Sequence, residues 1–435
     1  MLQNIAVAVS LFFFVPVVAV AAAVPKELDA YLALPDDSFR WEVLEKSETP
    51  TERTFLVELA SQTWHGITWK HFVLVAVPNK IINPNHAILF IAGSTIGKKP
   101  NDNDKILIRS LAEASGMCAA LLLQVPNQPL FGDFREDALI GETLIKAIET
   151  KDATWPLLFP MAKSAVRAMD AVQEMLKKEK QFEINGFIVT GASKRGWTTW
   201  LTAASGDKRV VAIAPMVIDT LNIRQQMKYQ LETWGTHSPS IHDYTDRNLI
   251  QLDDSKAPEF EKNLWTMVDP YSYRSRLTMP KLLIHGTNDP YWTVDASKHY
   301  FDDLPGVKYI LTLPNAGHGL DNQQIKGAMT LAVFAKYATQ GRDWPTVKWK
   351  QSENDAGYQI DVETDLSLRG VKLWTAQSET KDFRQAKWTS TTLEAKASLS
   401  VPVSKPESGH VAFFVELESA DENLPFSLTT QVWRF

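Results

Sequence analysis

Continuous apolar runs and amphipathic segments alternate along most of the chain. The runs are rich in β-branched residues, which is typical of strands buried on both faces of a sheet. They cover 87–92, 118–124, 187–190, 210–217, 280–285 and 308–313. Segments with helical spacing lie between them, at 105–115, 136–149, 160–180 and 323–339, with a shorter one at 296–301. This alternation predicts an α/β fold with a mostly parallel sheet and helices on both faces.

The pattern changes before this region and once inside it. Segments 55–59 and 64–77 alternate enough to predict antiparallel strands, after a helix and its exit at 26–39. Between 219 and 275 the periodicity falters, and only helical pieces around Gln225 and Phe260 remain. An insertion of this size between core strands is typical of a lid or of a wall of a substrate pocket.

The helical spacing is lost after residue 342. Short alternating segments follow, at 358–362, 371–374, 411–417 and 427–433. They predict a small all-β domain of the sandwich type. Because 435 residues exceed one usual core, we expect a large domain over 24–342 and this β domain over 343–435.

Composition and the first residues bear on class and location. The chain has 45% hydrophobic and 22% charged residues, as an ordinary globular protein does, and its net charge of −6 gives no footprint for nucleic acid. The apolar stretch 5–24 ends in alanines and predicts a signal peptide over 1–23, hence a secreted or periplasmic protein. No Lys or Arg precedes the stretch, so an uncleaved membrane anchor is the alternative. Cys118, the sole cysteine, lies in an apolar run and is expected to be a buried thiol.

A sharp turn is predicted where the 187–190 run meets Gly191, Ala192 and Ser193, because a segment typical of a helix follows at once. A strand, a turn with a serine at its tip and a helix are the layout of a nucleophile elbow. Such a turn lifts the hydroxyl above the sheet and leaves N–H groups of the helix free to bind an anion. The alternative is an ordinary turn in which Ser193 only caps the helix.

A serine nucleophile needs a base and a carboxylate that orients the base. In α/β-hydrolases the acid and then the histidine follow the serine, each on a loop after a core strand. Asp289 and His318 stand in such loops, and His318 has a glycine on each side. We therefore expect a catalytic triad of Ser193, Asp289 and His318. Asp295 is the nearest rival for the acid, and His285 is expected to be packed within its strand.

The oxyanion that forms during attack needs two hydrogen-bond donors. We expect the first from the backbone N–H of Lys194 and the second from Gly93 or Ser94, which follow the 87–92 strand. The usual elbow is G-x-S-x-G, but Arg195 occupies the position of the second glycine. Arg195 is therefore expected to point sideways out of the turn, either to a carboxylate or, as a pocket residue, toward an anionic group of the substrate. The pair of Lys194 and Arg195 either favours an acidic substrate or is a surface pair without a ligand.

Other chemistries find little support. His237 and His242 fall in the insertion and are candidate pocket residues, the alternative being solvated loop histidines. The sequence has no H-E-x-x-H motif, no cysteine pair and no carboxylate cluster with metal-ligand spacing. We therefore expect neither a metal nor a cofactor.

Eight segments form a specific combination: 125–130 (VPNQPL), 155–157 (WPL), 160–170 (PMAKSAVRAMD), 191–197 (GASKRGW), 301–306 (FDDLPG), 314–319 (PNAGHG), 413–417 (FFVEL) and 429–433 (TTQVW). Together they resemble the PhoPQ-activated pathogenicity-related protein family, whose own form of the elbow is Gly-x-Ser-Lys-Arg-Gly. In the loop of the acid, Pro290 directly follows Asp289, where the family would be expected to have glutamate. The resemblance implies an α/β-hydrolase fold and an exported protein linked, in bacterial members, to virulence or envelope defence. It also implies kinship with secreted eukaryotic signals that resemble an autocrine proliferation repressor, and the elbow is similar to that of carbohydrate esterases acting on glucuronate esters.

These observations favour a secreted or periplasmic serine hydrolase. We expect an esterase that acts on a small-molecule, carbohydrate or acidic ester through an acyl-enzyme on Ser193. One alternative is a non-catalytic secreted ligand that keeps the scaffold and binds a protein receptor. A serine peptidase with the same triad is another. None of these involves nucleic acid, or stable membrane insertion once the signal peptide is cleaved.

Overall fold

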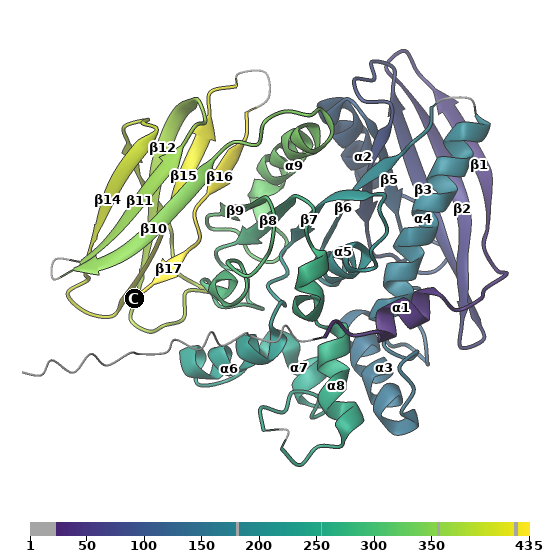
Figure 1. The fold of residues 1–435 in the computed structure, drawn as a ribbon, viewed down its shortest axis with the longest axis horizontal. Coiled ribbons are helices and arrows are strands. Elements are labelled where there is room, and N and C mark those ends of the chain that lie inside the picture. The colour runs from purple at the N-terminus through teal and green to yellow at the C-terminus, as the bar shows by residue number, and fades with distance from the viewer. Residues whose placement is uncertain (1–22, 180–181, 254, 355–356, 422–424) are drawn as a thin grey trace, which may run out of the picture.

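One large sheet runs through the protein in its computed structural model, which describes residues 23–179, 182–253, 255–354, 357–421 and 425–435 (Figure 1). The predicted signal peptide lies outside these residues, apart from Ala23. None of the described helices is long and apolar enough to cross a membrane.

The strands of the large sheet lie in the order β1-β2-β3-β5-β4-β6-β7-β8-β9-β16-β15-β12-β13, and β17 pairs with β15. Strands β5, β4, β6, β7, β8 and β9 are parallel to one another, whereas β1, β2 and β3 are antiparallel. This order, with β5 between β3 and β4, is that of the α/β-hydrolase fold, so the predicted fold class is confirmed. The strand bounds up to β9 are β1 (Arg40–Glu48), β2 (Glu52–Trp64), β3 (Ile67–Pro78), β4 (His86–Ile91), β5 (Cys118–Leu122), β6 (Gly186–Ala192), β7 (Val210–Met216), β8 (Lys281–Gly286) and β9 (Lys308–Leu313).

Helices cover both faces of the parallel strands. Within β4, Leu89 joins one hydrophobic core with α4 and α5, and Ile88 joins the core on the other face with α2 and α9. The two-sided burial explains why these strands read as continuous apolar runs. The helix bounds are α1 (Glu27–Leu32), α2 (Asp102–Ser115), α3 (Glu136–Thr150), α4 (Leu158–Lys178), α5 (Lys194–Ala204), α6 (Ile223–Trp234), α7 (His242–Thr245), α8 (Glu259–Val268) and α9 (Gln324–Thr339), with 3₁₀ turns η1 (Pro239–Ile241), η2 (Pro270–Arg276), η3 (Ala296–His299) and η4 (Asp321–Gln323).

The expected insertion lies between β7 and β8 and contains α6, α7 and α8, of which α7 and α8 lie beside α3 (Figure 1). It is fastened to the elbow helix, because the indole of Trp197 donates to the carbonyl of Val268 over 2.7 Å. The buried carboxylate of Asp269 accepts from the N–H of Ile223 at 2.9 Å and of Asn222 at 3.2 Å, at the beginning of α6. The insertion is therefore part of the folded body.

The region after residue 342 forms two packed layers. Strands β10 (Val347–Asn354), β11 (Gly357–Thr364) and β14 (Ser398–Ser404) make a separate three-stranded sheet. It packs on strands of the large sheet through a core that includes Ile360 and Phe413. The remaining strands are β12 (Leu368–Ser378), β13 (Thr389–Leu393), β15 (His410–Ser419), β16 (Ser427–Thr429) and β17 (Trp433–Arg434).

This β region is joined to the α/β part by sheet pairing as well as by the chain. Strand β16 pairs with β9, where Thr429 faces Ile310, and β15 pairs with β16. The sequence predicts a β sandwich here but not that one of its layers continues the central sheet. It also misses β1, whose side chains are mostly exposed. In the segment 26–39, predicted as a helix and its exit, the helix α1 takes Glu27–Leu32.

Candidate active site

Ser193 stands on a strained turn between β6 and α5. Its backbone has φ 58° and ψ −128°, a combination that L-residues rarely adopt and that typically occurs at functional sites. Glycine is required on either side. A Cβ on Gly191 would come 2.8 Å from the carbonyl oxygen of Arg195, and one on Gly196 would come 2.5 Å from the side chain of Ile218. The close approach thus falls three residues after the serine, which explains why Arg195 is tolerated at the usual glycine position.

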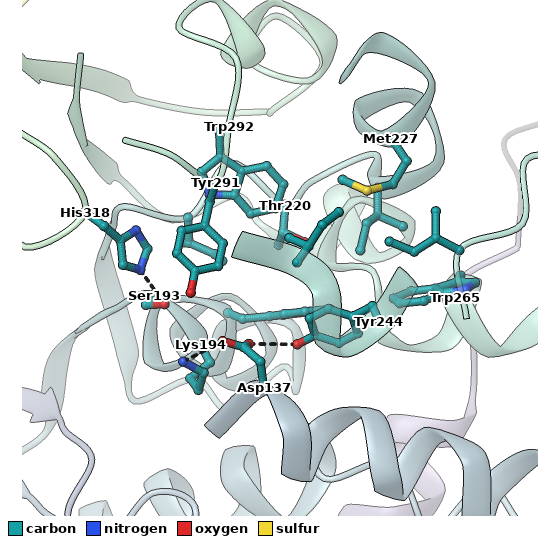
Figure 2. Close-up of a pocket in the computed structure, with 15 residues that line it drawn as sticks. Asp137, Ser193, Lys194, Thr220, Met227, Tyr244, Trp265, Tyr291, Trp292 and His318 are labelled. Carbon is teal, nitrogen blue, oxygen red and sulfur yellow. Dashed lines mark hydrogen bonds and ion pairs between the residues drawn. The ribbon is translucent and has the colours of Figure 1, made fainter. Parts of the chain in front are cut away.

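Three residues from different loops meet at this turn. The Nε2 atom of His318 lies 2.8 Å from Ser193 Oγ, and its Nδ1 atom lies 2.8 Å from Asp289 Oδ2 (Figure 2 draws the contact of His318 with Ser193). The second oxygen of Asp289 accepts the N–H of Tyr291 at 2.9 Å. A neutral imidazole that donates from Nδ1 to the carboxylate accepts the serine proton at Nε2, which is the arrangement of a nucleophile, base and orienting acid.

The rival residues lie elsewhere. Asp295 accepts the hydroxyl of Tyr229 at 2.6 Å and lies 3.0 Å from the ammonium of Lys298. His285 is buried, with Nδ1 3.2 Å from a carboxylate oxygen of Asp219. Both are thus engaged away from Ser193 in the structure.

The donors expected for an oxyanion are in part placed by the fold. Lys194 is the first residue of α5, so its N–H has no acceptor within the helix, and Lys194 lines the pocket at Ser193. Gly93 and Ser94 follow β4 as expected, but neither is among the pocket-lining residues. Gly93 instead packs on Arg195, where a Cβ would come 2.0 Å from the guanidinium. The second donor remains a prediction.

Arg195 is turned into the protein, which differs from the expectation of a pocket residue. Its Nε donates to the carbonyl of Val125 at 2.5 Å, and its two terminal nitrogens bind the carboxylate of Glu136 at 2.6 and 2.8 Å. Only 10% of its side chain is exposed. A bidentate pair of this kind has little capacity left for a ligand. The motif segments 125–130 and 191–197 meet through these contacts.

Lys194 belongs to the same cluster. Its ammonium lies 2.9 Å from Glu136 and 3.2 Å from Asp137, so two cations face two carboxylates. Glu136 also accepts the side-chain amide of Gln128 at 2.6 Å, and it has an unfavourable φ of 52°. Burial acts to raise the pKa of Glu136, but the hydrogen bonds and charge of Arg195 and the charge of Lys194 outweigh it and hold the pKa well below its usual value. Glu136 and Asp137 are not among the predicted site residues, because no motif marks them.

The histidines of the insertion also lie outside the pocket lining. The side chain of His242 is 64% exposed and near Asp243, and His237 is partly buried, with its Nδ1 unpartnered. Burial lowers the pKa of His237. Neither residue is brought to Ser193, because α7 presents Tyr244 to the pocket instead.

The pocket at Ser193 is walled mainly by apolar and aromatic side chains. About 480 Å³ of space, including the part open to solvent, lies between them. The ring of Tyr291 lies against the ring of His318 at a tilt of 32°, with the centroids 4.3 Å apart, and Tyr244 donates to Asp137 at 2.9 Å. Burial, followed by the charges of Asp137 and Asp289, raises the pKa of Tyr291 to about 12. The lining residues are Asp137, Ser193, Lys194, Trp197, Ile218, Thr220, Ile223, Met227, Ile241, Tyr244, Ile250, Trp265, Tyr291, Trp292 and His318 (Figure 2).

A segment of the C-terminal region supports the loops of the acid and the base. The amide of Asn288, next to Asp289, donates to the carbonyls of Ala386 at 2.8 Å and Arg384 at 3.1 Å. Asn315, three residues before His318, donates to the carbonyl of Trp388 at 2.9 Å and accepts its N–H at 2.8 Å. We call residues 383–388 the support segment.

Metal chemistry has no preformed site in the described residues, where no group of three or more His, Cys, Asp or Glu side chains converges. Cys118 is fully buried in β5, as expected, and burial raises the pKa of its thiol to about 12. It is therefore not a competing nucleophile.

Comparison with known sequences gives a matching family model and a relative. The family model described as "PhoPQ-activated pathogenicity-related protein" matches residues 28–384. "Autocrine proliferation repressor protein A" of Dictyostelium discoideum is 31% identical over 95% of this chain and 91% of its own.

Among solved structures, an acetyl xylan esterase of Thermoanaerobacterium sp. aligns at 14% identity with a TM-score of 0.51, over 72% of this chain and 94% of its own. An acetyl xylan esterase of Paenibacillus sp. R4 aligns at 13% identity with a TM-score of 0.47, over 67% and 87%. At such identities the likeness concerns the fold alone.

Proposed function

The chain belongs to the PhoPQ-activated pathogenicity-related protein family, and from that premise we propose that it is a serine hydrolase, specifically an esterase, of the α/β-hydrolase fold. Ser193 attacks the ester carbonyl, and His318 takes its proton and then delivers it to the leaving alcohol. Asp289 holds the imidazole and stabilises its charged form. The observation that carries the proposal is the position of His318, 2.8 Å from both Ser193 and Asp289.

Backbone N–H groups stabilise the oxyanion in this mechanism. Lys194 contributes one, and the loop with Gly93 and Ser94 contributes the other. Removing one such donor in other enzymes costs roughly 3–4 kcal/mol of transition-state stabilisation. The neutral cluster of Lys194, Arg195, Glu136 and Asp137 fixes the beginning of α5, and with it the direction of the Lys194 N–H.

The test is Ser193→Ala. We expect turnover of a p-nitrophenyl ester to fall roughly 10⁴- to 10⁶-fold, and labelling by a fluorophosphonate probe to disappear. Asp295→Asn is the matched control, because Asp295 is the rival acid that lies away from Ser193, and this variant should still be labelled by the probe. Hydrolysis that persisted in pure Ser193→Ala protein with an unchanged circular dichroism spectrum would refute the assignment.

A second candidate function is a secreted signal that binds a protein receptor. It is favoured by the relative named as an autocrine proliferation repressor, which spans 95% of the chain. Export is part of both proposals, and residues 1–22 lie outside the described part of the structure. A biological response that Ser193→Ala protein still elicits in full separates signalling from catalysis. A serine peptidase, the further alternative, would cleave an amide as well as the matching ester.

A further inference from the structure

The lining of the pocket at Ser193 indicates which class of ester the protein accepts. This inference rests on the proposed function. We propose that the pocket binds the acyl part of the substrate, and that this part is an uncharged apolar group, an alkyl or arylalkyl chain. The proposal differs from the acidic ester suggested by the Lys-Arg pair of the elbow. It follows from the direction, the lining and the charge of the pocket.

Direction follows from the proton transfer. The leaving alcohol must lie near His318 Nε2 to receive the proton, so the acyl group extends from Ser193 away from His318. Figure 2 shows Met227 and Trp265 across the pocket from His318, at the end remote from the histidine. The space on that side is therefore the place of the acyl chain.

The remote part of the lining comes from the insertion and is apolar. Ile223 and Met227 lie on α6, Trp265 lies on α8, and Ile250 lies between α7 and α8. The indole nitrogen of Trp265 donates to the carbonyl of Leu249 at 2.8 Å, so its polar atom is already used. Such walls stabilise a ligand chiefly through the apolar area that they remove from water.

The charged groups at the near end are neutralised by one another. Among the lining residues that the structure describes, Lys194 is the one cationic side chain, and it lies within 3.2 Å of Asp137 and 2.9 Å of Glu136. Asp137 in turn accepts the hydroxyl of Tyr244. An acyl group with its own carboxylate would lose hydration without finding a free positive partner, which is unfavourable.

The experiment compares esters of one leaving group on the full protein. We would measure kcat/KM for p-nitrophenyl acetate, butyrate and hexanoate and for the p-nitrophenyl half-ester of adipic acid, each divided by its rate with hydroxide. A buried methylene contributes about 0.8 kcal/mol, so kcat/KM should rise roughly four-fold per methylene up to hexanoate. The adipate half-ester should be at least tenfold slower than the hexanoate.

The experiment distinguishes failure of the acyl-pocket proposal from failure of the proposed function. A flat series with acetate fastest, or an adipate half-ester as good as hexanoate, overturns the acyl-pocket proposal and leaves the hydrolase intact. No hydrolysis of any ester, together with no fluorophosphonate labelling, refutes the proposed function itself.

A variant locates the effect in the pocket. Ile250→Trp adds bulk at the remote end and should lower the ratio of hexanoate to acetate kcat/KM at least tenfold. Ile106→Trp is the matched control, because Ile106 is 60% exposed on α2 and outside the pocket lining. An unchanged ratio in folded Ile250→Trp protein would place the acyl chain elsewhere and overturn the proposal. If that variant fails to fold, the wild-type series alone decides.

Discussion

The two sides of the candidate active site are held in different ways. On the nucleophile side, Ser193 sits on a turn whose geometry is fixed by nearby glycines and by ion pairs of the next two residues with Glu136. On the side of the acid and the base, Asp289 and His318 stand on loops supported by residues 383–388, which come much later in the chain. The first side depends mainly on charge, and the second on neutral hydrogen bonds to backbone.

This difference teaches what kind of damage each side tolerates. Loss of an ionic partner leaves a buried charge uncompensated and destabilises the fold. Loss of a neutral side chain at the support segment lets a loop move, and a displacement of about 1 Å already slows catalysis roughly 10²-fold. We therefore expect stability to respond on the nucleophile side and turnover on the other.

The largest effect on stability is expected for Glu136→Ala. Arg195, with 10% of its side chain exposed, would lose its bidentate partner. Breaking a buried ion pair costs roughly 3–5 kcal/mol, and we expect the low end, about 3 kcal/mol, because Glu136 itself is 40% exposed. Urea denaturation measures the change. Glu45→Ala, which breaks an exposed pair with Lys99, is the control and should cost under about 1 kcal/mol; equal losses in both variants would contradict the distinction.

Turnover should respond to Asn315→Gly. Asn315 has φ 54°, which glycine adopts without strain, so the variant removes only the side chain that binds Trp388. We expect kcat to fall roughly 10- to 100-fold, with KM changed less than about threefold because the pocket walls are untouched. Steady-state kinetics test this. Asn79→Ala, whose amide binds carbonyls of the remote residues Thr49 and Pro50, should leave kcat unaltered. A larger change in KM than in kcat would argue against a positioning role.

A smaller effect concerns acid stability. The depressed pKa of Glu136 means that its ionic contribution is fully present above the pKa of the unfolded chain, near 4.5, and is lost as the pH falls toward the folded value. The difference in melting temperature between wild type and Glu136→Gln should therefore be greatest at pH 6 and shrink toward pH 3. Melting curves of both proteins at several pH values measure this difference. A difference that widened on acidification would mean that Glu136 binds its proton above 4.5.

The smallest effect is expected for His242→Ala. This histidine is 64% exposed and outside the pocket lining, so kcat/KM should stay within twofold and stability within about 0.5 kcal/mol. Ester hydrolysis and melting of the purified variant measure both. A tenfold loss of kcat/KM would indicate that His242 contacts the substrate after all.

The sequence predicts elements better than it predicts contacts between them. The Lys308–Leu313 strand and the strand before Ser193 are visible because burial on both faces gives continuous apolar runs. Ser193, Asp289 and His318 could be chosen because they follow core strands in the order typical of α/β-hydrolases. The structure brings these three residues together. The β1 strand escapes because it has no buried face to mark it.

Long-range contacts leave no such mark. Arg195 reads as a residue beside the nucleophile, but its direction depends on Glu136 and Val125, which lie 59 and 70 residues away in the sequence. The support of Asn288 by Ala386 spans 98 residues. The pocket-lining residues of the insertion could not be chosen because the periodicity that assigns faces is weak there. Only a fold that brings these segments together reveals them.

The pairing of β16 with β9 has a consequence for the order of events during synthesis. Thr429 and Ile310 are 119 residues apart, so β9 has an open edge while the ribosome makes the intervening chain. The support segment is made in the same interval, after the loops of Asp289 and His318. A nascent chain can therefore carry Ser193, Asp289 and His318 and yet lack the backbone that steadies two of them. The loops of Asp289 and His318 therefore gain their support only from chain made after them, and β9 presents an unpaired strand edge, open to pairing with other chains, until β16 is made.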